Sequence, residues 1–416
     1  MKSLLQFIKQ FISNQGLFVF LSGVVTKLSM MFINIIGARL IPEADFGLIV
    51  LVSSVFVVFT PLIGLGSNQG LLRFGILQKT DEAKAELNRY VFLKGLINHV
   101  FITLAFCVVS VVYALKYDGI LWVIGFFAVR LLGYYFFNHI QAYYRMYGNN
   151  KIYSQVNMSV YLSGLALAGI LTYFFGILGY LISMSVMPWV SLIYMKKRPR
   201  LSLAKPSIDL KQFWRYSIHA SLTYFFSDML FAMDFLLIGL FLDETSVAFY
   251  KVAVMLPMSL SFLPLIFMHT DYPKIVANST NGSYLRFYVV NYYKLFIPIA
   301  ILILIVGYLM KDSIIPLVFG ENYRESDGRV FFVMLAALVG NMLMRNLYGN
   351  MISAIGKAHW NTVTSIGALV IILGLGIWWI PIYGIMGAAA GMAVAFTFTG
   401  ITGMLLFHNY LRNLKT

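Results

Sequence analysis

The sequence predicts an all-α, polytopic membrane protein, and three observations carry that prediction. Hydrophobic residues make up 60% of the 416 residues, charged residues only 11%, and the mean hydropathy is +0.81. A soluble domain needs far more polar surface than this. Apolar runs of about 18 to 25 residues recur along the whole chain, which is the length of a transmembrane helix, whereas a transmembrane β-barrel shows alternating segments of about ten residues.

The apolar runs predict about twelve transmembrane spans. They fall at residues 17–38, 46–67, 91–113, 119–138, 153–174, 177–195, 216–241, 247–268, 287–309, 329–348, 362–380 and 384–407. An even number of spans places both termini on the same side of the membrane.

The distribution of basic residues predicts that this side is the cytoplasm. With both termini inside, most Lys and Arg residues of the loops and tails lie inside, above all in 196–215 (KKRPRLSLAKPSIDLKQFWR) and 78–89 (QKTDEAKAELNR). The outside connections then hold only Arg39, Lys116, Lys311, Arg324 and Arg329. The positive-inside rule therefore accounts for the formal charge of +15, and no nucleic-acid partner is expected.

The chain also contains an internal repeat. Gly148, Gly176 and Gly179 recur as Gly356, Gly384 and Gly387, each 208 residues later (356 − 148, 384 − 176 and 387 − 179). The segment 32–47 is echoed by 235–250 at a slightly shorter offset: Ile36-Gly37 corresponds to Ile238-Gly239, and one residue is gained before Phe46 matches Phe249. We therefore expect an N-terminal lobe of six spans at 1–195, a basic cytoplasmic linker at 196–215 and a C-terminal lobe at 216–416. Because six is even, the two lobes run in the same direction, which is a transporter architecture with a site expected between the repeats.

A lysine near the middle of the first span is the most informative single residue. Lys27 lies about ten residues from each end of that span, where a charge costs roughly 2.5 to 3.5 kcal/mol on insertion scales. Lys27 shares one helical face with Gly23 and Asn34, and neighbouring Ser and Thr residues widen this face into a polar stripe. A polar stripe on an apolar helix indicates a water-filled lumen.

Basic residues outnumber acidic ones inside the spans. Candidate ligands for the substrate are Lys27, Asn34, Arg73, Arg130, Lys251, Lys294 and Arg345. The alternative for Arg130, Lys251 and Lys294 is that they reach a nearby headgroup region. A basic lumen attracts an anion, and Arg and Lys are the natural partners of phosphate.

Two acidic residues, Asp228 and Asp234, lie in the seventh span about 120° apart on its helix. One interpretation is a structural ion pair with a lumenal lysine. The other is that one of them exchanges H⁺ or Na⁺ and couples transport to an ion gradient.

The sequence offers little for catalysis or for a cofactor. The longest outside loop, 311–329, is too short for a catalytic domain, and we find no phosphate-binding glycine loop and no metal-spaced His/Cys cluster. We therefore expect no enzyme, no cofactor and no metal site.

Several motifs resemble one transporter superfamily. They are ARLIPEADFGLIVL and GLGSNQGLLRFG in the first half, PLVFGENYRESDGRVFFVMLAALVG in the second, and the GKAHWN and G-I-x-G elements of the repeats. Together they resemble the polysaccharide exporters of the multidrug/oligosaccharidyl-lipid/polysaccharide (MOP) superfamily, and twelve spans fit the Wzx-type O-antigen or capsule repeat-unit flippases within it.

The resemblance implies a V-shaped pair of six-helix lobes, as in the MATE transporters, around a cationic cavity. The cargo would be an oligosaccharide on undecaprenyl diphosphate, flipped from the cytoplasmic to the periplasmic leaflet of a bacterial inner membrane. A polysaccharide polymerase and a chain-length regulator would be the protein partners, beside the membrane lipids.

Four alternatives remain at this point, and one of them, a passive membrane scaffold, would not need Lys27 in a span or a polar stripe around it. A multidrug/cation antiporter of the MATE type is disfavoured by the excess of basic residues, and a peptidoglycan-precursor flippase by the number of spans. A membrane-embedded polysaccharide polymerase or ligase would need a larger outside loop.

Overall fold

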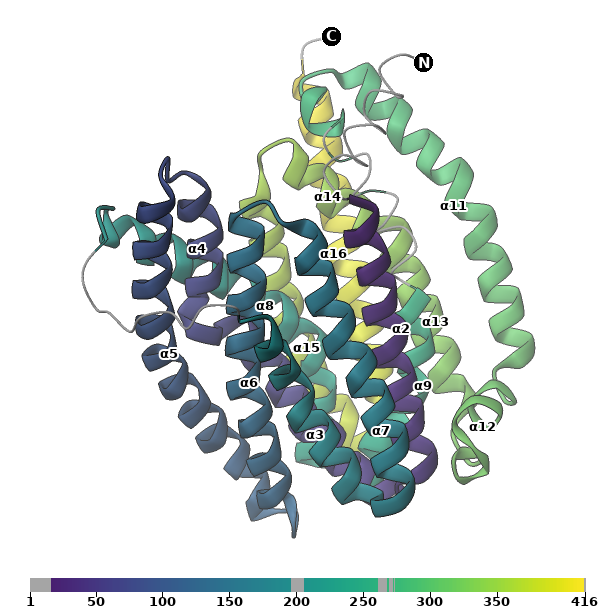
Figure 1. The fold of residues 1–416 in the computed structure, drawn as a ribbon. Helices are drawn as coiled ribbons and strands as arrows, with labels where there is room; N and C mark the ends of the chain where they lie inside the picture. Colours follow the sequence, from purple (N-terminus) through teal and green to yellow (C-terminus); the bar gives the residue numbers. More distant parts are fainter. Residues whose placement is uncertain (1–15, 196–205, 261–267, 269–271, 273, 415–416) are drawn as a thin grey trace. The chain divides into compact units, whose positions relative to one another are not determined.

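The computed structural model describes residues 16–195, 206–260, 268, 272 and 274–414 (Figure 1). The described residues are almost entirely helical and contain no strand, which confirms the predicted all-α class. The chain divides into two compact units, Met1–Asp228 and Met229–Thr416, and helix α8 (Leu210–Phe241) contributes to both. The first half of the predicted basic linker, residues 196–205, lies outside the described residues, and the predicted lobe boundaries stay a prediction.

The first unit is built from long apolar helices joined by short connections. Its elements are α2 (Gly16–Leu40), α3 (Glu43–Phe59), the 3₁₀ segment η1 (Thr60–Gly66), α4 (Ser67–Ile76), α5 (Asp81–Val111), η2 (Val112–Leu115), α6 (Ile120–Met146), α7 (Asn150–Val186), η3 (Met187–Tyr194) and the first part of α8. Helix α2 packs along α7, and α6 packs against both α5 and α7.

The second unit continues from the last part of α8. Its elements are α9 (Glu244–Leu260), α11 (Gly282–Met310), α12 (Ile314–Phe319), η4 (Glu321–Tyr323), α13 (Gly328–Asn341), the π-helical segment η5 (Met342–Asn346), α14 (Leu347–Ala354), α15 (Ala358–Tyr383) and α16 (Ile385–Asn413). Helix α16 packs against α13 and α15.

The described residues contain ten helical runs that are long and apolar enough to cross a membrane. One of these runs, Asn150–Tyr194, covers both the fifth and the sixth predicted spans, because it is kinked at Gly176 rather than ended there. The eighth predicted span begins as α9, and most of its last eight residues lie outside the described residues. The polytopic α-helical class is confirmed.

The second predicted span, 46–67, is broken where an uninterrupted helix was expected. Residues Ile63, Gly64 and Leu65 leave helical φ/ψ values, and Gly64, Leu65 and Gly66 have positive φ of 58°, 53° and 71°. Leu65 is the only non-glycine residue with positive φ in the described part of the chain. Pro61 and the two glycines of the sequence PLIGLG are the physical reason, since Pro lacks an N–H and Gly tolerates positive φ.

The internal repeat appears in the backbone of each unit separately. Gly176 has φ 56° and ψ −134°, and Gly384 has φ 59° and ψ −142°. At Gly179 an added Cβ would overlap the carbonyl oxygen of Leu171, and at Gly387 it would overlap that of Trp379, the residue at the same offset. The two G-I-x-G sequences therefore form the same tight kink.

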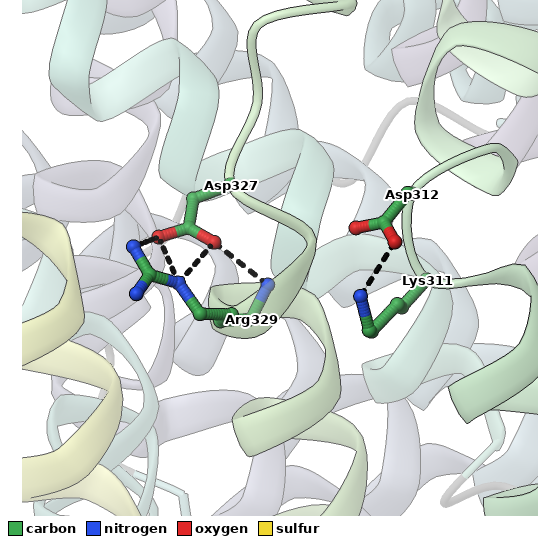
Figure 2. A network of polar contacts seen from close by, with 4 residues as sticks. All are labelled: Lys311, Asp312, Asp327 and Arg329. Atoms are coloured by element: carbon green, nitrogen blue, oxygen red, sulfur yellow. Dashed lines mark hydrogen bonds and ion pairs between the residues drawn. The ribbon is translucent and has the colours of Figure 1, made fainter.

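The connection before α13 contains a network of polar contacts among Lys311, Asp312, Asp327 and Arg329 (Figure 2). The Asp327 carboxylate accepts hydrogen bonds from the Arg329 backbone N–H at 2.8 Å and from its guanidinium at 2.9 to 3.1 Å, which caps the helix N-terminus. Lys311 pairs with Asp312 beside it. The hydrogen bonds from Arg329 hold the pKa of the Asp327 carboxyl below its ordinary value.

We expect the two kink glycines to be indispensable for stability. Gly176→Ala and Gly384→Ala should each lower the free energy of unfolding by about 1 to 3 kcal/mol, because their φ/ψ region is essentially restricted to Gly. Gly169→Ala in α7 and Gly374→Ala in α15 are matched controls, since an added Cβ meets nothing closer than 3.9 Å there. Thermal unfolding in one detergent measures all four, and equal melting temperatures for kink and control variants would contradict the role of the kink.

Asp327 should stabilise the start of α13 in a pH-dependent way. Asp327→Ala should cost about 0.5 to 2 kcal/mol as the loss of an N-cap. Asp327→Asn keeps the cap and removes the charge, and should cost at most about 1 kcal/mol because the partner is exposed. Since the folded-state pKa is lowered, this charge contribution is present above the ordinary carboxyl pKa of about 3.9 and is lost as the pH falls below it.

The measurement is the melting temperature of wild type and variants between pH 7 and pH 3. The gap between wild type and Asp327→Asn should narrow toward pH 3. Glu325→Ala, which removes an exposed carboxylate of the same loop, is the control. A gap that stays constant over this range would show that the Asp327 charge does not stabilise the fold.

Candidate functional site

The first unit contains an open cavity of about 260 Å³ with several polar side chains in its lining. It lies where the broken second span meets α4, the last third of α6 and the middle of α8. Its lining residues are Thr60, Pro61, Ile63, Gly66, Asn68, Gln69, Leu72, Asn138, Gln141, Ala142, Arg145, Tyr224 and Asp228. Four side-chain amides therefore face one small space, together with one cation, one carboxylate and one phenol.

The helix break supplies one wall of this cavity. Backbone that leaves the helix at membrane depth is tolerated only where protein covers it or where it borders a water-filled space. The Pro61 carbonyl, freed by the break, accepts a 2.7 Å hydrogen bond from the Ser221 hydroxyl of α8. At Gly66 an added Cβ would overlap the Ser217 carbonyl, so α8 lies directly on the break. The break and α8 together fix the shape of the cavity.

Two of the four amides are held in place by buried neighbours. The Asn68 carbonyl oxygen lies 3.3 Å from the ring nitrogen Nδ1 of His139, whose side chain is buried. The Gln141 NH₂ group donates a 2.5 Å hydrogen bond to the side-chain oxygen of Asn157 in α7. These contacts orient the amides and leave the Asn68 NH₂ and the Gln141 carbonyl for a ligand.

Three sequence-predicted site residues lie on α2 and α4 of the same unit. The Lys27 side chain is exposed, and its charge acts on Asp228 of the cavity wall. Asn34 is half-buried and donates to the Met30 carbonyl one turn earlier. Arg73 is exposed and lies 4.4 Å from the ring centre of Tyr216. The structure thus brings Lys27 into electrostatic reach of the cavity, while Arg73 stacks on α8.

Arg130 is enclosed by aromatic rings. Its side chain is 2% exposed, and its guanidinium lies 4.7, 5.3 and 5.6 Å from the ring centres of Phe56, Phe127 and Tyr134. Its Nε has no hydrogen-bond acceptor within the described residues. The rings supply the negative π-face that a desolvated cation needs.

The remaining predicted site residues belong to the second unit. Asp234 is buried and accepts hydrogen bonds from the Tyr250 hydroxyl at 2.7 Å and from the Phe235 backbone N–H at 2.9 Å. Lys251 is half-buried, lies 5.5 Å from the Phe235 ring centre and acts electrostatically on Asp234.

Arg345 and Lys294 complete that set. Arg345 lies in the π-helical segment of the tenth predicted span, 5.2 and 5.9 Å from the ring centres of Phe231 and Phe396. Such π-segments are frequent at functional sites. Lys294 is exposed on α11.

The sequence reasoning missed the amides of the cavity. Asn68 and Gln69 belong to the motif GLGSNQGLLRFG, and Asn138 and Gln141 to FNHIQAYY at the end of the fourth span. Asn68, Gln69 and Gln141 lie just past the predicted ends of their spans at residues 67 and 138, and Asn138, at the end of its span, is neutral and so indicates a polar partner less strongly than a charge does. Asp228 is the one predicted residue that lines the cavity.

A family model described as polysaccharide biosynthesis protein matches residues 13–279, which is more than half of the chain. The chain belongs to this family. The match covers α2 to α9 and therefore includes every residue that lines the cavity. No curated protein sequence matches the chain.

Solved structures of transporters share the fold over nearly the whole chain. An inward-facing multidrug resistance MATE family transporter of the MOP superfamily aligns with a TM-score of 0.70 at 15% identity, covering 94% of this chain and 95% of its own. The lipid II flippase MurJ in an inward closed conformation aligns with a TM-score of 0.69 at 14% identity, covering 95% and 87%. A MOP superfamily transporter from Pyrococcus furiosus gives 0.60 at 16% identity, covering 98% and 97%. The predicted resemblance to the MOP superfamily is confirmed.

We expect Arg130 to be required first for stability. Arg130→Ala should lower the free energy of unfolding by about 2 to 5 kcal/mol, as for other truncations of long buried side chains. Arg130→Lys keeps the charge but loses the planar stacking, and should cost less, about 0.5 to 2 kcal/mol. Arg215→Ala on α8, an exposed arginine, is the control and should stay within about 0.5 kcal/mol of wild type. Thermal unfolding measures all three. An unchanged melting temperature for Arg130→Ala would show that the contacts between the Arg130 guanidinium and the three rings do not stabilise the fold.

Proposed function

We propose that this member of the polysaccharide biosynthesis family flips a lipid-linked oligosaccharide across the membrane. The cargo is a repeat unit of O-antigen, capsule or exopolysaccharide on undecaprenyl diphosphate, moved from the cytoplasmic to the periplasmic leaflet of a bacterial inner membrane by alternating access. Both termini lie in the cytoplasm. The observation that carries the proposal is the family match on a chain whose fold is that of transporters.

The charges inside the spans support a diphosphate cargo. Lys27 is exposed on α2 instead of being sealed into the helix packing, so it is available to an anion. An ammonium group in a lumen with low-dielectric walls offsets the charge of a diphosphate that would otherwise be very costly to move through the membrane. Lys251, Lys294, Arg73 and Arg345 are further candidates for this role, and Asp228 or Asp234 for coupling to H⁺ or Na⁺.

Multidrug transport is the alternative with the same fold. Two of the similar structures are multidrug resistance MATE family transporters, but at 15% and 18% identity they support the fold alone. The family match favours a polysaccharide precursor instead. A polysaccharide polymerase and a chain-length regulator would then take the cargo on the outer side.

Replacing Lys27 should impair export without unfolding the protein. We expect Lys27→Ala to reduce surface polysaccharide strongly and Lys27→Glu to eliminate it, while lipid-linked repeat units accumulate on the cytoplasmic leaflet. The measurement is surface glycan and lipid-linked intermediate in cells that depend on this protein, with protein levels checked. Lys211→Ala, an exposed lysine at the start of α8, is the control.

A charge swap separates substrate binding from a structural ion pair. If Lys27 serves only as a partner for Asp228, the double variant Lys27→Asp with Asp228→Lys should restore export. If Lys27 meets the diphosphate, the swap should stay inactive. Normal glycan in the single Lys27 variants would contradict the proposed role of this residue.

A further inference from the structure

The cavity of the first unit has a composition that the diphosphate does not explain. Its lining residues include one cation, Arg145, and one carboxylate, Asp228, so its formal charges cancel. A site for a diphosphate needs several positive charges and no carboxylate. A site for a cation would lack Arg145. The largest class of polar residues in the lining is instead the neutral amides of Asn68, Gln69, Asn138 and Gln141.

Side-chain amides match hydroxyl groups in both directions. Each amide offers two N–H donors and a carbonyl acceptor, and a hydroxyl donates one hydrogen bond and accepts others. Asp228 adds an acceptor-only group, and Thr60 adds a hydroxyl. A ligand that carries several hydroxyls on adjacent atoms satisfies this set, whereas an apolar drug would leave without a partner the amide groups that His139 and Asn157 do not already bind.

The cavity is already organised for binding. Buried His139 and Asn157 hold Asn68 and Gln141 in fixed orientations, and the break at Ile63–Gly66 is fixed by Pro61 and Ser221. A preorganised set of hydrogen-bonding groups loses little conformational entropy on binding. Positive φ at Leu65 is a strained conformation of the kind that clusters at ligand sites.

An aromatic side chain and the size of the cavity narrow the ligand further. Tyr224 lines the cavity and is 55% exposed, so its ring is available to an apolar C–H face. A cavity of about 260 Å³ is smaller than the roughly 300 to 1,000 Å³ of sites for drug-sized molecules. It accommodates about one sugar ring, and because it is open on one side the rest of a repeat unit can lie outside it.

We infer that this cavity is a saccharide subsite that binds one sugar ring of the cargo through its hydroxyl groups. The inference rests on the proposed function and adds a second, uncharged point of recognition beside the diphosphate. α4 ends at Ile76 and α6 ends at Met146, and the charge pattern places the segment that follows α4 in the cytoplasm. The subsite therefore lies toward the side from which the cargo enters.

The test compares lipids with and without a sugar. The probes are undecaprenyl diphosphate and its derivatives that carry glucose, galactose or N-acetylglucosamine, and the readout is the dissociation constant for the purified full-length protein. Wild type should bind at least one sugar-bearing lipid more tightly than the bare diphosphate lipid. Gln69→Ala and Asn138→Ala should each reduce this preference by about 2- to 12-fold, the range for one lost hydrogen bond, and leave the affinity for the bare lipid unchanged.

Gln69 and Asn138 are chosen because Asn68 and Gln141 also hold protein neighbours. Tyr224→Ala should reduce the preference, and Tyr224→Phe should retain most of it, because the aromatic face is kept. Gln212→Ala on α8, an exposed amide outside the cavity, is the matched control and should behave as wild type. Equal melting temperatures show that each variant is folded.

Each other outcome overturns the inference in a recognisable way. Unchanged preference in the Gln69 and Asn138 variants would show that the sugar does not enter this cavity. Equal weakening of the bare and the sugar-bearing lipids would assign the cavity to the diphosphate. Wild type that binds the bare lipid through Lys27 but prefers no sugar-bearing probe would overturn the subsite and leave the proposed function standing. Wild type that binds no diphosphate lipid at all would overturn both.

Discussion

The first unit depends on one constraint, which is that backbone polar groups inside a membrane must find partners within the protein. A continuous helix meets this constraint by itself, and a broken one does not. The second span breaks at Ile63–Gly66, which leaves the Pro61 carbonyl without a partner in its own helix. The Ser221 hydroxyl of α8 satisfies this carbonyl with a hydrogen bond. At Gly66 and Gly70 an added Cβ would overlap Ser217 of α8, so only glycine permits this close approach. The position of α8, and with it that of Tyr224 and Asp228, follows from the need to cover the break.

The same constraint explains which parts of the fold could be predicted from the sequence. Span length follows from bilayer thickness, so apolar runs indicate the spans directly. The repeat was visible because Gly176 and Gly384 occupy a backbone conformation that other residues do not adopt, and such glycines are retained in both halves. Where the chain departs from regular helix without a unique residue type, as in the π-segment Met342–Asn346, no comparable signal exists. The break at Ile63–Gly66 was only partly predictable. The sequence PLIGLG contains the Pro and Gly residues that allow a helix to break, but it lies within an apolar run that otherwise predicts a continuous span.

The sequence predicted that charged residues inside the spans would form the candidate site, but it did not predict which of them are buried or that amides line the cavity. Lys27 and Asp228 are charges in spans, and the structure relates them electrostatically. Charged residues at similar positions in their spans differ in how far the structure buries their side chains. Arg130 is enclosed by three rings and Lys27 is exposed, although both lie near the middle of a span. The environment of such a residue depends on aromatic side chains from other helices, and a single sequence does not show which helices pack around it. Three of the four amides, Asn68, Gln69 and Gln141, lie just beyond the predicted ends of the second and fourth spans, where the apolar runs give no signal.

If cations bind the diphosphate and amides bind the sugar, the two parts of the cargo are recognised by different interactions, and this affects which lipids can cross the membrane. A diphosphate is neutralised by a few cations at almost any orientation, because Coulomb attraction is weakly directional. Sugar hydroxyls need partners at defined distances and angles, and an unpaired hydroxyl in an apolar environment costs about 1 to 3 kcal/mol on protein mutational scales. A lumen lined only with cations would therefore carry any diphosphate lipid, bare or loaded, and would return empty carrier as readily as it exported cargo. An amide-lined subsite gives the loaded lipid an affinity that the bare lipid lacks, and since specificity is a difference of affinities, the subsite would select the loaded lipid for transport.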